Sequence, residues 1–177
     1  MDHQEILDFW FSELSDEDWF AKSDALDSQI QQRFSDAHRR ACLGEFFLWR
    51  DAAHGRLAEI IILDQFSRNI YRDKVGAFAS DAQALALAQE AVALGIADQL
   101  SSDAERMFLY MPYMHSESLL IQNESVRLFQ AIGNDEYAIA HRNIIEKFGR
   151  YPHRNEIMNR ASTEEELEYL KNGGQTF

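Results

Sequence analysis

The sequence has few of the residues that interrupt or cross-link a chain: one cysteine, two prolines and eight glycines among 177 residues. The scarcity of proline and glycine disfavours a disordered or all-β protein and favours a compact, mostly helical one. The single cysteine, Cys42, excludes an internal disulfide and is typical of a reducing cytoplasm. We interpret Cys42 as a small, buried hydrophobic residue on a helix rather than as a nucleophile.

Positive charge is scarce as well. Seventeen lysine and arginine side chains stand against thirty aspartate and glutamate side chains, so the net charge is −13. This balance disfavours phosphate-rich partners, namely nucleic acids and anionic membranes. No run approaches the roughly 20 apolar residues that span a bilayer, and residues 1–11 lack the basic start of a signal peptide. We therefore predict a soluble, cytoplasmic protein that binds neither nucleic acid nor membrane.

Apolar residues recur at helical spacing, and no segment alternates with the two-residue period of a strand. The nearly continuous apolar run at 57–63 predicts a central helix. The expected helices cover residues 2–11, 23–44, 55–72, 80–95, 102–133 with a kink or break at Pro112, 134–149 and a short segment after 162. Capping boxes are expected at Ser80 with Gln83, Ser102 with Glu105 and Ser162 with Glu165. About eight helices predict an all-α single domain over residues 1–177, a bundle of stacked antiparallel helical hairpins without a clear repeat.

Three stretches are richer in polar groups than a helical core requires, and the first is LDQFSRNIYR at residues 63–72. Asp64, Arg68 and Arg72 stand four residues apart, which predicts a ladder on one helix face. Asn69 crowds the same region with further hydrogen-bonding groups. The alternative is a solvated stripe of salt bridges, in which each pair contributes only a few tenths of a kcal/mol.

The second stretch, FLYMPYMHSES at residues 108–118, surrounds a proline. Proline inside a helix frees a backbone carbonyl and often marks a functional bend. Tyr110, His115 and Glu117 supply polar groups around it. His115 and Glu117 are two positions apart and point to different faces, so they form no dyad within this helix. The alternative is a kinked core helix that holds a hydrogen-bonded, buried histidine.

The third stretch, from His141 to Arg160, holds five of the seventeen basic side chains and only two acids, whereas an even spread would place about two basic side chains there. The dipole of a helix C-terminus explains part of this enrichment. The turn RYPHRN adds the donors of Arg150, His153, Arg154 and Asn155. One interpretation is anion binding, and the other is helix capping by Asn155 combined with surface ion pairs.

Metal and cofactor motifs are not among these stretches. The chain has no H-E-x-x-H sequence, no pair of cysteines and no two histidines four residues apart, so we predict no metal site. It also has no glycine-rich phosphate loop, nucleotide fingerprint or nucleophilic triad, so we predict no cofactor.

Five segments of the sequence resemble an uncharacterised bacterial family, domain of unknown function 924. They are GRLAEIIILDQFSRNIYR, AFASDAQALALA, FLYMPYMHSESL, HRNIIEKFGRYPHRN and STEEELEYL, and they follow one another across nearly the whole chain. The resemblance implies a helical fold similar to tetratricopeptide-type hairpins, but no reaction. The residues that match the family's motifs are Asp64, Gln65, Arg68, Asn69, Tyr110, His115, Ser116, Glu117, His141, Arg150, His153, Arg154 and Asn155.

Three positions differ from the family pattern. Ser67 stands where proline is usual, Tyr151 stands where phenylalanine is usual, and MNR replaces LGR at 158–160. The loss of glycine in that last motif makes Asn159 a candidate for the left-handed conformation.

Three hypotheses follow, and each depends on whether the three polar stretches meet in space. The first is a pocket for a small anionic molecule, with His115 or Glu117 as a general base of a hydrolase or transferase. Its ligand-binding residues would be Asp64, Arg68, Asn69, Arg72, Tyr110, His141, Arg150, His153, Arg154 and Asn155. The second is a tetratricopeptide-like scaffold that binds a peptide or partner protein in a groove. The third is a purely structural polar cluster.

Overall fold

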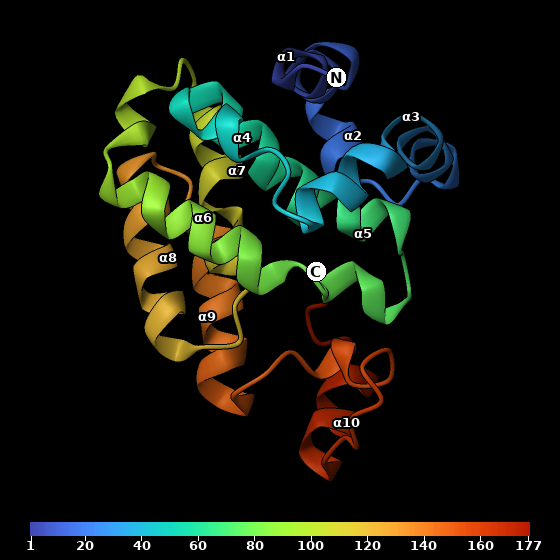
Figure 1. Cartoon of the computed structure of the whole chain (residues 1–177). Coiled ribbons are helices and arrows are strands. Elements are labelled where there is room, and N and C mark those ends of the chain that lie inside the picture. Colours follow the sequence, from blue (N-terminus) through green and yellow to red (C-terminus); the bar gives the residue numbers. More distant parts are fainter.

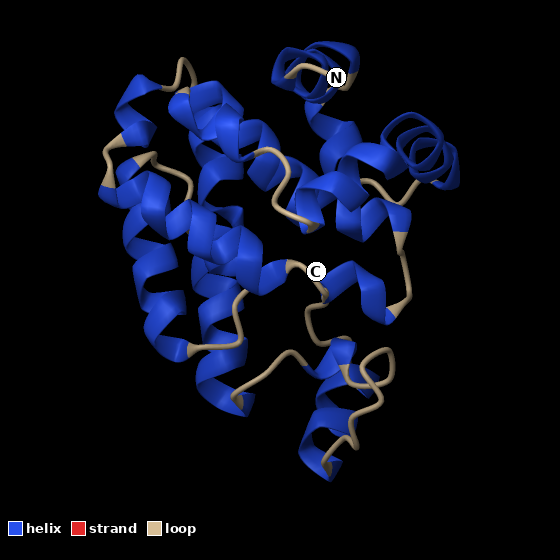
Figure 2. Cartoon of the chain, viewed as in Figure 1, coloured by secondary structure: helices blue, strands red, loops and turns tan.

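The computed structural model describes all residues from 1 to 177, and its regular elements are all helical (Figure 1, Figure 2). The α-helices are α1 (His3–Asp8), α2 (Asp16–Phe20), α3 (Asp24–Cys42), α4 (Ala53–Ile61), α5 (Ser67–Ile70), α6 (Asp81–Ala93), α7 (Asp103–Met114), α8 (Leu119–Ala131), α9 (Glu136–Phe148) and α10 (Glu164–Lys171). Wide π-helical turns cover η1 (Phe9–Glu13) and η3 (Ile62–Phe66). Short 3₁₀ turns cover η2 (Phe47–Asp51), η4 (Val75–Phe78), η5 (Ile96–Gln99) and η6 (Pro152–Arg154). The all-α prediction is confirmed.

The apolar core is built around α4, as the run at 57–63 predicts. Leu57, Ile60 and Leu63 have no exposed surface, and α4 packs against α1, α6 and α7. On one side of the molecule, α7 packs on α8 and α8 on α9, which places these three consecutive helices together (Figure 1). A smaller apolar cluster joins α9 to the turn RYPHRN at residues 150–155, called the basic turn below. This cluster contains Ile144, Ile145 and the fully buried Tyr151.

A π-helical turn connects α4 to α5 and carries the first polar stretch. Its five residues, Ile62–Phe66, continue the rod from Ala53 to Ile70 with one wider turn. Such bulges shift the phase of a helix and are frequent at functional sites. Arg68 lies 3.1 Å from Asp64, as the expected ladder requires. The ladder is wrong for Arg72, which lies beyond the end of α5 and pairs with Asp27 of α3 instead.

The helix break expected at Pro112 lies a few residues after the proline. Helix α7 continues past Pro112 to Met114, and α8 starts at Leu119, so residues 115–118 form the joint. Pro112 stands in the last turn of α7. Its missing N–H removes the helical hydrogen bond to the carbonyl of Phe108.

Several local predictions shift by one residue or are wrong. Thr163 with Glu166 forms the last capping box, one position after the expected pair. The hydroxyl of Ser80 makes no capping bond and lies 3.3 Å from the sulfur of Cys42. Cys42 is exposed, in contrast to the buried position expected for it, because it ends α3 at the surface. Asn159 has a φ angle of 53°, which confirms the left-handed conformation expected from the missing glycine.

None of the helices combines the length and the apolar character that crossing a membrane requires.

Candidate functional site

The first two polar stretches meet at Asp64. This residue lies on the π-helical turn and is 1% exposed. One carboxylate oxygen, Oδ1, is 2.8 Å from Nδ1 of His115, the residue that ends α7. The same oxygen is 3.1 Å from Nη1 of Arg68, and Gln65 donates to the other oxygen. Burial would raise the pKa of Asp64, but Arg68 and the hydrogen bonds from His115 and Gln65 hold it well below its ordinary value.

His115 is held as a neutral imidazole. Burial is the main cause that lowers its pKa, and the charge of Arg68 acts in the same direction, while Asp64 opposes both. Because Asp64 is ionised, we assign the ring proton to Nδ1, which donates to the carboxylate. The remaining nitrogen, Nε2, then carries a lone pair and makes no hydrogen bond within the protein. A carboxylate behind a neutral imidazole is an arrangement suited to general-base chemistry.

Arg68 is bound by carboxylate and carbonyl groups. Its two Nη atoms donate to the two oxygens of Asp81, at 3.0 and 3.1 Å, as a forked pair. Nη1 also donates to the carbonyl oxygen of Asp64 at 2.8 Å. Asp81 starts α6, so this pair ties the central rod to the neighbouring helix. The side chain of Arg68 thus orients Asp64.

Arg154, from the third polar stretch, completes the cluster. It is 6% exposed and lies against two aromatic rings, with its guanidinium carbon 4.4 Å from the ring centre of Tyr151 and 4.7 Å from that of Phe78. Nη1 donates to the carbonyl oxygen of His115 at 3.1 Å and lies 3.6 Å from a carboxylate oxygen of Asp81.

The hydrogen bonding of Arg154 is incomplete. The bond from Nη1 to His115 is its only one, and Nε is buried with no hydrogen-bond partner. Burial lowers the pKa of Arg154, and the nearby charge of Arg68 adds to this effect. A buried guanidinium with unused donors is energetically unfavourable unless another group accepts from them.

Two further histidines surround this guanidinium. The ring of His141 on α9 is 6.5 Å from that of His115 and 5.7 Å from that of Tyr151. Its Nδ1 donates to the carbonyl oxygen of Tyr137, and burial lowers its pKa to about 3. Burial lowers the pKa of His153 to about 4, and its Nδ1 is buried without a partner. Both imidazoles are therefore neutral at neutral pH.

The C-terminal tail covers one side of this cluster. Phe177 stacks on His141, with ring centres 3.5 Å apart and an interplanar angle of 20°. Phe177 itself is 46% exposed, and Figure 1 marks the C-terminus near the centre of the view.

Glu117 lies next to the cluster, but its oxygens are occupied. They accept from both Nη atoms of Arg160, at 2.6 and 2.9 Å, and from the backbone N–H of Tyr151 at 2.7 Å. Burial would raise the pKa of Glu117, whereas these hydrogen bonds hold it below its ordinary value. Glu117 thus fastens the basic turn to the joint between α7 and α8.

The other predicted residues lie in separate networks. Asn69 donates to Asp27 at 2.8 Å, beside the pair formed by Asp27 and Arg72. Arg150 donates to both oxygens of Glu166, at 2.6 and 2.8 Å. Asn155 contributes a bond of 3.2 Å to the same Glu166, so it supports the capping box of α10 rather than forming the cap itself. Tyr110 is buried against Phe129, with ring centres 6.0 Å apart.

Sequence reasoning missed two members of the cluster, Phe78 and Asp81. Both lie in the segment AFASDAQALALA, which contributes to the family resemblance. The acidic residue at the start of a predicted helix was a usable signal, because carboxylates at such positions often bind a cation from elsewhere in the fold. No group of three or more histidine, cysteine, aspartate or glutamate side chains is placed to hold a metal ion. Two surface hollows, of about 430 and 180 Å³, lie away from this cluster.

Comparisons with known proteins agree with the resemblance. A family model described as "Bacterial protein of unknown function (DUF924)" matches residues 6–174. The structure of a protein of unknown function from Agrobacterium tumefaciens is similar to this chain, with a TM-score of 0.92 and 38% sequence identity, and 97% of each chain is covered. No curated protein matches the sequence.

Proposed function

The chain belongs to the DUF924 family of bacterial proteins, whose description names no reaction, and we propose from the cluster itself that it binds a small anionic molecule beside Arg154 and His115. A hydrolase or transferase acting on that molecule is the reaction class we propose. The proposal is supported by residues from three distant segments that lie around one guanidinium.

The observation that carries the proposal is the buried Nε of Arg154, which has no hydrogen-bond partner. A carboxylate or phosphate oxygen is the acceptor that a guanidinium binds most strongly, through two parallel bonds from Nε and an Nη atom. The rings of Tyr151 and Phe78 lie against this guanidinium, and Arg154 is only 6% exposed. This confinement favours a small anionic group over a bulky one.

The proposed base is Nε2 of His115. It would accept a proton from water or from a hydroxyl group of the substrate, while Asp64 holds the ring and stabilises the positive charge that develops. Glu117 is the weaker choice because Arg160 and the N–H of Tyr151 occupy its oxygens.

Charge balance gives this proposal a pH dependence. Asp64 and Asp81 already offset the charges of Arg68 and Arg154. A bound anion therefore adds a negative charge that protonation of a nearby imidazole, His115, would neutralise. Because the pKa of His115 is lowered in the protein alone, the anion should raise it, and affinity should increase as the pH falls.

The test is a thermal-shift screen with phosphorylated and carboxylated metabolites against three forms of the protein. Arg154→Gln removes the guanidinium at similar volume, and Arg72→Gln is the matched control, since Arg72 pairs with Asp27 in a separate network. A ligand is expected to raise the melting temperature of the wild type and of Arg72→Gln, but not of Arg154→Gln. No shift in the wild type, or an equal shift in Arg154→Gln, would contradict anion binding at this place.

A second variant separates binding from reaction. His115→Asn keeps a polar side chain but has no basic nitrogen. It should retain the ligand-induced shift and lose any turnover of that ligand, measured as product released. Unchanged turnover would assign the base elsewhere. Stability changes without any ligand effect would instead favour the purely structural cluster.

The alternative function is a tetratricopeptide-like scaffold for a peptide or partner protein. It is supported by three exposed apolar side chains after α3, namely Leu43, Phe47 and Leu48, which are 64%, 59% and 67% exposed. Exposed apolar patches often mark partner surfaces. Capture of a specific partner by the wild type, and its loss with Phe47→Ser, would support this function.

We also propose a cytoplasmic location, which the single cysteine supports.

A further inference from the structure

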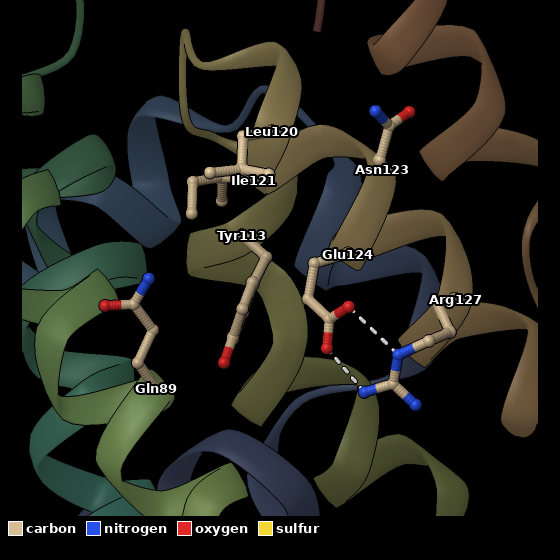
Figure 3. Close-up of a pocket in the computed structure, with 7 residues that line it drawn as sticks. All are labelled: Gln89, Tyr113, Leu120, Ile121, Asn123, Glu124 and Arg127. Atoms are coloured by element: carbon tan, nitrogen blue, oxygen red, sulfur yellow. Dashed lines mark hydrogen bonds and ion pairs between the residues drawn. The ribbon is translucent and has the colours of Figure 1, made fainter.

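We propose that a second site, between α6, α7 and α8, binds a small uncharged molecule that has an apolar body and a carbonyl-type hydrogen-bond acceptor. A hollow of about 430 Å³ lies there, separate from the cluster around Arg154 (Figure 3). Its volume falls in the range of about 300–1,000 Å³ that is usual for small-molecule sites. This proposal does not depend on the anion-binding function.

The floor of the hollow contains an unused donor, the hydroxyl group of Tyr113. This residue is 4% exposed, and its hydroxyl makes no hydrogen bond within the protein. Figure 3 shows its side chain extending into the space between Gln89 and Glu124. Burial raises the pKa of Tyr113 to about 12, so the group keeps its proton at neutral pH. The hydroxyl oxygen itself is not buried, so an acceptor that enters the hollow can reach it.

The walls combine apolar surface with neutral amides. Leu120 on α8 is 78% exposed, and Ile121 beside it is half-buried. Gln89 from α6 and Asn123 from α8 stand at the rim, and each amide can both donate and accept hydrogen bonds. A molecule with an apolar body can cover Leu120 and Ile121 while its polar end reaches the hydroxyl below.

The charge of the hollow favours a ligand without charge. Its two ionised groups, Glu124 and Arg127, are one turn apart on α8 and pair with each other, with 2.9 Å from Nε to Oε2. The two charges offset each other, so the hollow carries no net charge, and the net charge of −13 opposes the approach of anions. An uncharged acceptor, such as an amide or ketone carbonyl, fits the lone donor of Tyr113.

The experiment is a titration with defined probes, followed by two-dimensional NMR of the labelled full chain. Benzamide and cyclohexanone are the uncharged carbonyl probes, benzoate is the anionic counterpart, and toluene lacks the acceptor. The carbonyl probes should shift the side-chain amide signals of Gln89 and Asn123, and should bind more tightly than benzoate or toluene. Tyr113→Phe should weaken binding of benzamide roughly threefold to tenfold, which corresponds to one neutral hydrogen bond.

Two further variants make the result decisive. Tyr110→Phe, in the same helix but outside the hollow, is the matched control and should bind benzamide as the wild type does. Leu120→Glu changes an exposed wall residue without disturbing the core and should weaken binding even if Tyr113→Phe folds poorly. The proposal is overturned if neither carbonyl probe shifts Gln89 or Asn123, if benzoate binds equally well, or if both Tyr113→Phe and Leu120→Glu bind as the wild type does.

Discussion

The bond network of Glu117 predicts a large loss of stability for a small chemical change, Glu117→Gln. The carboxylate accepts two bonds from Arg160 and one from the backbone of Tyr151. Its side chain is 25% exposed and that of Arg160 is 22% exposed, so water replaces these bonds poorly. The glutamine amide would keep the size of the group. Its own N–H donors, however, would face one of the three N–H donors that the carboxylate accepts from in the wild type.

The expected magnitude follows from these contacts. A hydrogen bond to a charged group contributes roughly 1.5–3 kcal/mol, and removing one charge leaves the guanidinium of Arg160 incompletely paired. Glu117→Gln should therefore lower the free energy of unfolding by about 2–3 kcal/mol. For a chain of this size, each kcal/mol corresponds to about 2–4 °C, which gives a fall in melting temperature of about 4–12 °C.

The assay is urea denaturation with a matched exposed pair as the control. Glu124 pairs with Arg127 on the surface, where the two side chains are 40% and 62% exposed, so Glu124→Gln should change stability by less than about 0.5 kcal/mol. The double variant with Arg160→Gln should recover part of the loss, because both charges are then absent. Equal effects of Glu117→Gln and Glu124→Gln would refute the reasoning.

The same pair has a defined pH dependence. The folded protein holds the pKa of Glu117 below its unfolded value, so its contribution is fully present above the unfolded value. The contribution is lost as the pH falls through the folded value. The stability difference between wild type and Glu117→Gln should therefore shrink in acid, and a difference that grows in acid would contradict the assignment.

Three other perturbations have expected outcomes. His141 and His153 have pKa values lowered from 6.5 to about 3 and about 4, so the unfolded chain binds more protons below about pH 6.5. Each histidine should therefore lower the free energy of unfolding by about 1.4 kcal/mol per pH unit as the pH falls towards the pKa of that histidine in the folded protein. Denaturation at several pH values measures this loss. Ser67→Ala should destabilise the protein by roughly 1–3 kcal/mol, because the buried Nε2 of His38, now 2.7 Å from the serine hydroxyl, keeps only the weak 3.7 Å contact with the sulfur of Cys42. An unchanged urea midpoint would exclude this. Gly55→Ala would press a methyl group into the backbone of η2 and should lower the melting temperature more than any of these changes.

Much of the helical architecture is readable from local patterns. Apolar spacing located the long helices, and the run at 57–63 identified the central one. The positions of their ends were less certain, because a cap depends on the geometry of the whole turn. Ser162 and Thr163 both have the chemistry of a cap, and only the approach of Arg150 to Glu166 favours the second.

The sequence predicted the kinds of chemical group in the candidate site, but only some of the residues that form it. Asp64, Arg68, His115 and Arg154 were expected and lie together. Asn69 shares α5 with Arg68, and Arg72 follows the end of this helix, but both side chains bind Asp27 instead of the cluster. Asp81 joins the cluster from a segment that sequence spacing had not connected with it.

By itself, the sequence determined which segments are helical, which residues are buried in the central rod, and that positive charge gathers near the basic turn. These properties depend on spacing along the chain and on composition, so they are visible without coordinates. Only the tertiary structure decided that Arg154 is buried against His115, that Glu117 is bound by Arg160, and that Tyr113 keeps an unused hydroxyl. The physical reason is that hydrogen bonding and burial depend on neighbours that packing brings from distant positions, and helical periodicity carries no information about those neighbours.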